Sequence, residues 1–241
     1  MPPSPTTPAN VSPLPTATLV LMAIACGLCA GANYFNQPLL HSIAQQLHIS
    51  DAQAASTVTM AQVSYGLGLL FLVPLGDMLE RRRLVFVLML LAAVGMALSG
   101  VSGVLGSFGL LATGTLMAGV FSVASQVLVP MAATFAAPGT SGRAVGLVMS
   151  GLLIGILASR SVAGILSGLG GWSTVYWVGS ACTALMAVLL ARALPQAPPA
   201  GPVGYGQVMQ SLLQLLRQHP RLRSRALIGG AGFATVSVLF S

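Results

Sequence analysis

Charged residues are scarce in this sequence. Its 241 residues include three acidic residues, ten arginines and no lysine, so charge makes up only 5% of the chain. With 55% hydrophobic residues and a mean hydropathy of +0.89, this composition excludes an ordinary soluble domain. The net charge of +7 would suggest nucleic acid in a soluble protein. Here the arginines, apart from Arg160, border apolar stretches, as they do in the cytoplasmic loops of membrane proteins. We therefore expect no nucleic-acid partner.

Long apolar stretches account for most of the chain. Six of them are long enough to cross a hydrocarbon core of ~30 Å as helices. They comprise residues 16–36, 52–75, 84–104, 110–135, 144–169 and 175–194. Short turns separate them, and the 28 glycines suit close packing between membrane helices. The sequence therefore predicts an all-α membrane protein with six transmembrane helices in the lipid bilayer.

The apolar stretches lack the residues that catalysis would need. The acids are Asp51, Asp77 and Glu80, and the histidines are His41, His48 and His219. All six lie outside the stretches, so no serine and histidine can face each other as in an intramembrane protease. The sequence also has no phosphate-binding loop and no metal-ligand cluster. We therefore expect no enzymatic activity, no metal and no cofactor.

The arginines indicate the orientation in the membrane. Arg81, Arg82 and Arg83 lie between the second and third stretches, and Arg143 lies between the fourth and fifth. The N-terminus and the gaps after the first, third and fifth stretches contain no arginine or lysine. Because basic loops stay in the cytoplasm, this pattern predicts a cytoplasmic N-terminus and a cytoplasmic segment after the sixth stretch.

Three further segments flank the six stretches. Residues 1–15 are rich in proline and predict a disordered cytoplasmic tail. Residues 195–225 predict a cytoplasmic linker, in which 207–219 forms an amphipathic helix along the membrane surface. Residues 226–241 are uncharged and apolar, as at the start of a seventh span, but they are too few to cross the membrane. We interpret the chain as cut off within that span.

Four residues at the end of the second stretch and in the gap that follows it match a loop motif. They are Leu75, Asp77, Arg81 and Arg82. The motif, G-x-L-a-D-r-x-G-r-k, occurs at this position in the major facilitator superfamily of transporters, which the chain resembles over residues 16–241. Glu80 stands where that family usually has glycine. Asp77 can pair with Arg81 four residues on. In the family, such a cluster helps to hold the two halves together on the cytoplasmic side. The alternative is that these arginines only anchor a cytoplasmic loop.

The fifth stretch resembles the antiporter motif of drug:proton antiporters within that family. The matching positions are Gly146, Gly155, Ser159, Ala163 and Gly164, with serine and alanine in place of two glycines. Arg160 replaces the proline that kinks this helix in the family. In the fourth stretch only Gln126 matches the motif R-x-x-Q-G, and Val123 occupies the arginine position. We hypothesise that Arg160 supplies the missing cation.

The resemblance implies a fold and a function. It implies the N-terminal half of a bacterial inner-membrane transporter with an inverted 3+3 helix repeat, which moves a small organic molecule by alternating access. Efflux, with protons as the coupling ion, is what the antiporter-like motif implies. The pathway would lie between two halves, so the partner would be a missing C-terminal half or another copy in a homo-oligomer. The alternative is a transport-inactive remnant or a membrane scaffold.

Arg160 is the one charged residue deep inside an apolar stretch. It lies seventeen residues beyond Arg143, or ~25 Å along a helix, which places it past the middle of the membrane. Such a residue almost always faces the helix bundle or a watery cavity. It could bind a substrate or a coupled ion, donate to helix carbonyl groups, or extend its side chain to the membrane surface.

Uncharged polar residues are the other candidates for substrate binding or coupling. They are Asn33, Tyr34, Asn36, Gln37, Gln62 and Gln126. The first four could instead be interfacial residues at the end of the first stretch. No span carries a carboxylate, so proton coupling would need Asp51 or a group in a second half. Asp51 precedes an apolar stretch, where a helix cap is the simpler role.

Cysteines and aromatic residues have structural interpretations. Cys26 and Cys29 have the spacing of redox or metal motifs, but no histidine or carboxylate lies nearby in the sequence. We interpret them as small residues in a packed helix. Trp172, Tyr176 and Trp177 begin the sixth stretch and predict an aromatic belt at the outer membrane surface.

The predicted orientation can be tested by labelling single introduced cysteines in intact cells. A membrane-impermeant thiol reagent should modify sites next to His48 and Trp172 from outside, because the loops there carry no arginine. A site next to Pro199 should react only after the membrane is opened. Labelling of the Pro199 site in intact cells would contradict the six-span topology.

Overall fold

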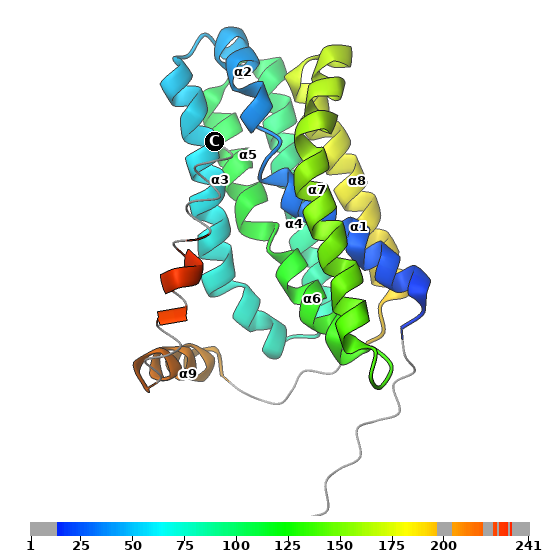
Figure 1. Ribbon diagram of the computed structural model, residues 1–241. Coiled ribbons are helices and arrows are strands. Elements are labelled where there is room, and N and C mark those ends of the chain that lie inside the picture. Colours follow the sequence, from blue (N-terminus) through cyan, green and yellow to red (C-terminus); the bar gives the residue numbers. More distant parts are fainter. Residues whose placement is uncertain (1–13, 197–203, 219–223, 226, 231, 233–241) are drawn as a thin grey trace, which may run out of the picture.

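The structure is a bundle of antiparallel helices (Figure 1). This computed structural model describes residues 14–196, 204–218, 224–225, 227–230 and 232. Its elements are α1 (Thr16–Ala32), η1 (Gln37–Leu39), α2 (Leu40–Leu47), α3 (Asp51–Phe71), η2 (Val73–Asp77), α4 (Arg81–Leu105), α5 (Phe108–Phe121), α6 (Ala124–Thr134), α7 (Ser141–Gly170), α8 (Trp172–Ala193) and α9 (Tyr205–Gln218). The regular elements in these ranges are all helical, which confirms the predicted all-α class.

Five passes are long and apolar enough to cross a membrane, and a bent pair of helices makes a sixth. The bent pair is α1 with residues 37–47, at an angle of 41°. The sequence placed the end of this span at residue 36, but its helical path continues to Leu47. Pro38 explains the break, because proline has no amide hydrogen and its ring clashes with the carbonyl group four residues earlier.

The fourth pass is also interrupted. It comprises α5 and α6, and a turn at Ser122 and Val123 separates them. Pro130, by contrast, lies inside α6. The two interrupted passes meet, because the Asn33 side chain after α1 donates a hydrogen bond of 2.8 Å to Oγ of Ser122.

Neighbouring passes run in opposite directions, so the arginines of the described bundle other than Arg160 collect at one end (Figure 1). This arginine end contains Arg81, Arg82 and Arg83 at the start of α4, Arg143 in α7 and Arg192 in the last turn of α8. The helix α9 lies beside η2 at the same end. The opposite end contains α2 and the start of α3.

Two predicted segments lie mostly outside the described residues. The tail over 1–15 is described only at Leu14 and Pro15, and the backbone amide of Leu14 bonds the carbonyl group of Phe135 at 3.1 Å. The seventh span over 226–241 is described only at 227–230 and 232. The linker over 195–225 is described mainly at α9, where the side chains at 212, 213, 216 and 217 are also outside the description.

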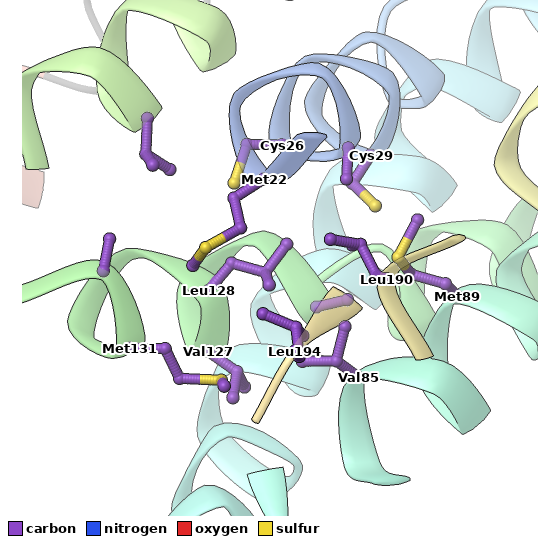
Figure 2. Close-up of a cluster of buried hydrophobic side chains, with 14 of the residues drawn as sticks. Met22, Cys26, Cys29, Val85, Met89, Val127, Leu128, Met131, Leu190 and Leu194 are labelled. Atoms are coloured by element: carbon purple, nitrogen blue, oxygen red, sulfur yellow. The ribbon is translucent and has the colours of Figure 1, made fainter. Parts of the chain in front are cut away.

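The interior is filled by two hydrophobic clusters. Figure 2 shows the one nearer the arginine end, where Met22 and Cys26 of α1 meet Leu128 of α6 and Leu190 of α8. Cys26 and Cys29 are 0% and 1% exposed, and both belong to this cluster as packed side chains. The second cluster fills the opposite end around α2 and the start of α8.

The predicted aromatic belt is wrong for two of its three residues. Trp172 and Tyr176 are only 1% and 4% exposed, and their rings meet edge to face with centroids 5.8 Å apart. Four residues apart on a helix, they share one face of α8, and this face is directed into the bundle. Trp177 is 43% exposed and lies against Gly100 of α4.

Glycines let α1 and α7 approach to backbone contact. A Cβ atom on Gly27 would lie 2.7 Å from the carbonyl oxygen of Gly151, and one on Gly155 would collide with the backbone of Gly27. A side chain at either position would push the helices apart. Small residues at such a crossing replace the hydrophobic driving force that lipid does not supply.

Substitutions in α7 test this contact. Gly155→Ala should lower the free energy of unfolding by about 1–3 kcal/mol, because the added methyl group overpacks the crossing. Gly164→Ala is the matched control in the same helix, since nothing lies within 4 Å of a Cβ atom there. Unfolding in mixed micelles measures both. Equal stability of the two variants would show that the crossing does not need glycine.

Candidate functional site

Arg160 lies about two-thirds of the way along α7. It follows Ser141, the first residue of α7, by nineteen residues, or ~28 Å in a helix that is ~45 Å long. Its side chain is half-buried, and Nη2 donates a hydrogen bond to Oε1 of Gln37. Gln37 opens η1, directly after the break in the first pass. The pair therefore joins α7 to the point where the first pass bends.

The crossing of α1 and α7 lies next to the pair formed by Arg160 and Gln37. Gly155, Ser159 and Ala163 recur every four residues and form one stripe of α7. A Cβ atom on Gly155 would meet Gly27, and Ser159 and Ala163 are 2% and 0% exposed. Arg160 lies at the edge of this stripe. The other two positions of the antiporter-like motif, Gly146 and Gly164, have open space around them.

The asparagines after α1 are buried inside the bundle. Asn33 is 7% exposed, and its Nδ2 atom donates to the carbonyl group of Cys29 at 3.3 Å as well as to Ser122. Asn36 is 3% exposed and donates to Oγ1 of Thr57 on α3 at 3.3 Å. The break is thus held by amide side chains, and Tyr34 beside them is half-buried.

The two glutamines on α3 and α6 occupy other positions. Nε2 of Gln126 donates to the hydroxyl group of Tyr65 at 3.0 Å and so links α6 to α3. Gln62 is half-buried on α3, and no hydrogen bond joins its side chain to another described residue. Arg160 contacts Gln37 instead, which follows the bend of the first pass.

The loop-motif residues form a cluster at the arginine end. Nη2 of Arg81 lies 3.5 Å from Oδ1 of Asp77, and its Nε atom donates to the carbonyl group of Gly76 at 3.1 Å. Arg82 and Leu75 are half-buried beside them. Glu80, which replaces the usual glycine, accepts a bond from Nε of Arg83 at 2.8 Å.

A cavity of about 370 Å³ adjoins this cluster. Asp77, Arg81 and Gln126 line it, together with Val208 of α9. The hydroxyl group of Tyr205, also on α9, donates to the carbonyl group of Phe71 at 3.1 Å. The surface helix is therefore attached where α3 ends.

Asp51 lies on the surface at the opposite end. The N-cap of α3 is Ser50, whose hydroxyl group accepts from the amide of Gln53 in a capping box, so the cap role suggested for Asp51 is wrong. Asp51 is in the first turn, 3.9 Å from Nδ1 of His41, and both side chains are mostly exposed. His41 itself lies in α2 rather than in a loop.

An apolar groove of about 430 Å³ runs between α1 and α7. Val20, Ile24 and Ile154 line it, and it extends to Phe35 and Ser159. Arg160 follows Ser159 directly in the chain but is not itself one of the residues that line the groove. The almost wholly apolar walls suit the apolar body of a ligand.

These features define a class of protein. Interrupted membrane helices, small-residue crossings and a charged side chain within a span are characteristic of secondary transporters, in which broken helices form the binding site. Comparisons with known proteins agree. The sequence profile described as Major Facilitator Superfamily matches residues 22–241, and the chain belongs to that family.

Individual relatives are also described as transporters. The chain is 48% identical over 228 residues to the uncharacterized transporter YgaY of Escherichia coli O157:H7, and 31% identical over 250 residues to a probable transporter of Streptomyces coelicolor. Each alignment covers 95% of this chain and 57% of the relative. The chain thus spans little more than half the length of the curated relatives that it matches.

A solved structure supports the fold. The crystal structure of a D-xylose-proton symporter matches with a TM-score of 0.53 at 19% identity, over 93% of this chain and 57% of that one. Sequence reasoning missed several polar partners, namely Thr57, Tyr65 and Ser122. Serine and threonine hydroxyl groups in membrane helices often bond their own backbone, so nothing in the sequence indicates that Thr57 and Ser122 link different passes.

Proposed function

We propose that this protein moves a small organic anion across a bacterial inner membrane by alternating access, with the arginine end in the cytoplasm. The observation that carries the proposal is the position of Arg160. A charge at this depth costs several kcal/mol unless it faces the bundle interior or water. The hydrogen bond to Gln37 holds it at the bend of the first pass, where transporters form their sites.

The charge of Arg160 supports an anionic substrate. A guanidinium group presents its N–H donors as a planar fork that matches a carboxylate or phosphate. Coulomb attraction is stronger in a poorly hydrated cavity than in water. The neighbouring groove between α1 and α7 has almost wholly apolar walls, so an organic body attached to the anionic group would fit there.

Efflux is the proposed direction. Its support is the antiporter-like stripe of Gly155, Ser159 and Ala163, which faces the bundle on α7. Proton coupling is a weaker part of the proposal. The acids Asp51, Asp77 and Glu80 lie outside the membrane interior of the described passes, and Asp51 is exposed. A proton-coupled cycle would take its titrating group from a second half.

A second candidate function is a membrane scaffold that transports nothing. The observation that favours it is an exposed apolar face on α7. Leu153, Ile154 and Leu157 of α7 are more than half exposed, and they need lipid, a second half or another copy to cover them. Transport by the proposed mechanism therefore requires a partner for this face.

Substitutions at Arg160 test the transport proposal. Arg160→Lys keeps the charge but loses the planar fork, so efflux of an organic anion should fall roughly tenfold, as expected when a charged hydrogen bond is lost. Arg160→Ala should lower it further and shift preference toward neutral solutes. Arg143→Lys is the matched control in α7, where the arginine only anchors the membrane edge.

The measurement is solute efflux from cells, normalised to the amount of protein in the membrane. Each variant is expressed alone and together with the C-terminal half of the Streptomyces coelicolor relative. Unchanged efflux in Arg160→Ala would show that Arg160 only donates hydrogen bonds within the fold and does not bind the substrate. Absence of flux in every combination, with normal membrane levels, would favour the scaffold.

A further inference from the structure

Three buried polar atoms without partners surround one small cavity. Among the described residues, Oδ1 of Asn36, Oγ1 of Thr115 and the hydroxyl oxygen of Tyr176 are buried with no hydrogen-bond partner. All three residues line the same cavity, and they are 3%, 6% and 4% exposed. They come from three elements, since Asn36 follows α1, Thr115 is in α5 and Tyr176 is in α8.

The size of the cavity limits its occupant. Its volume is about 10 Å³, and the rest of its wall is largely apolar, with Ala61, Met96 and Ala118 among the lining residues. A cavity of this size holds about one water molecule, which needs roughly two to four polar partners. Leaving a buried polar atom unpaired costs about 1–3 kcal/mol, so three such atoms around one void need an explanation.

We propose that this cavity binds one ordered water molecule. Water can donate to Oδ1 of Asn36, which only accepts, and it can accept from the hydroxyl groups of Thr115 and Tyr176. The three atoms then lose their desolvation penalty together. A sodium ion fits less well, because no carboxylate lines the cavity to balance its charge.

The water molecule would fix the bend of the first pass. Nδ2 of Asn36 already donates to Thr57 on α3. The water would bond the oxygen of the same amide and so link the bend to α5 and α8 as well. Gln37, the partner of Arg160, follows Asn36 directly. The site thus positions Gln37, and its existence does not depend on what the protein transports.

Radiolytic labelling in heavy-oxygen water tests the site, because hydroxyl radicals formed from a bound water oxidise the side chains that touch it. Met96 and Met89 form a matched pair on α4, since they are 1% and 0% exposed. Met96 lines the cavity, whereas Met89 belongs to the hydrophobic cluster at the arginine end. In the intact protein in nanodiscs, Met96 and Tyr176 should be labelled severalfold faster than Met89.

Variants that remove only hydroxyl groups sharpen the test. Thr115→Val with Tyr176→Phe keeps the shape of the wall, and Met96 labelling should fall to the rate of Met89. Ser102→Ala is the control, because the Ser102 hydroxyl group is buried on α4 but donates to the carbonyl group of Ser99 at 2.6 Å. It should leave Met96 labelling unchanged.

Two results would overturn the proposal. Equal labelling of Met96 and Met89 in the unaltered protein would show that the cavity is dry. Loss of Met96 labelling when sodium is added, at constant ionic strength, would show that a cation occupies it instead. Because both results come from the unaltered protein, the proposal stays testable even if the double variant fails to fold.

Discussion

The contact between α1 and α7 is the interaction on which the candidate site depends. In lipid, apolar side chains gain little by meeting each other, so helices associate where small residues allow close van der Waals contact. Gly27, Gly151 and Gly155 bring these two helices to backbone contact. Arg160 lies only five residues beyond Gly155, and the bend of the first pass then places Gln37 against it. A wider crossing would separate this pair.

The described bundle keeps most of its charges at the arginine end, with Asp51 at the opposite surface, and uses neutral polar groups inside. At the arginine end, Asp77 pairs with Arg81 and Glu80 pairs with Arg83. Within the membrane region, amide and hydroxyl groups link the passes, as Asn33 does with Ser122 and Gln126 with Tyr65. Arg160 is the exception to this arrangement, and an exception that costs free energy is a reasonable candidate for function.

Much of the fold could be predicted from the sequence, because runs of apolar residues directly determine which segments cross a membrane. The family could also be predicted, from short motifs. The path of the first pass could be predicted only in part, since Pro38 explains the break but the position of the helix beyond it depends on contacts such as those of Asn33 and Asn36. Trp172 and Tyr176 were assigned to the membrane surface because composition alone does not show which face of α8 is directed inward. The pairing of Arg160 with Gln37 follows from the bend, which the apolar runs of the sequence do not reveal.

The central claim is that the charge of Arg160 selects an anionic group, and ligand binding tests it most directly. Thermal stabilisation of the purified protein, paired with the C-terminal half of the Streptomyces coelicolor relative, would be compared for an organic carboxylate and the matching neutral amide. The account predicts that the carboxylate binds roughly tenfold more tightly, as for a hydrogen bond to a charged partner, and that Arg160→Gln abolishes this difference. The same preference for the carboxylate in the Arg160→Gln variant would contradict it.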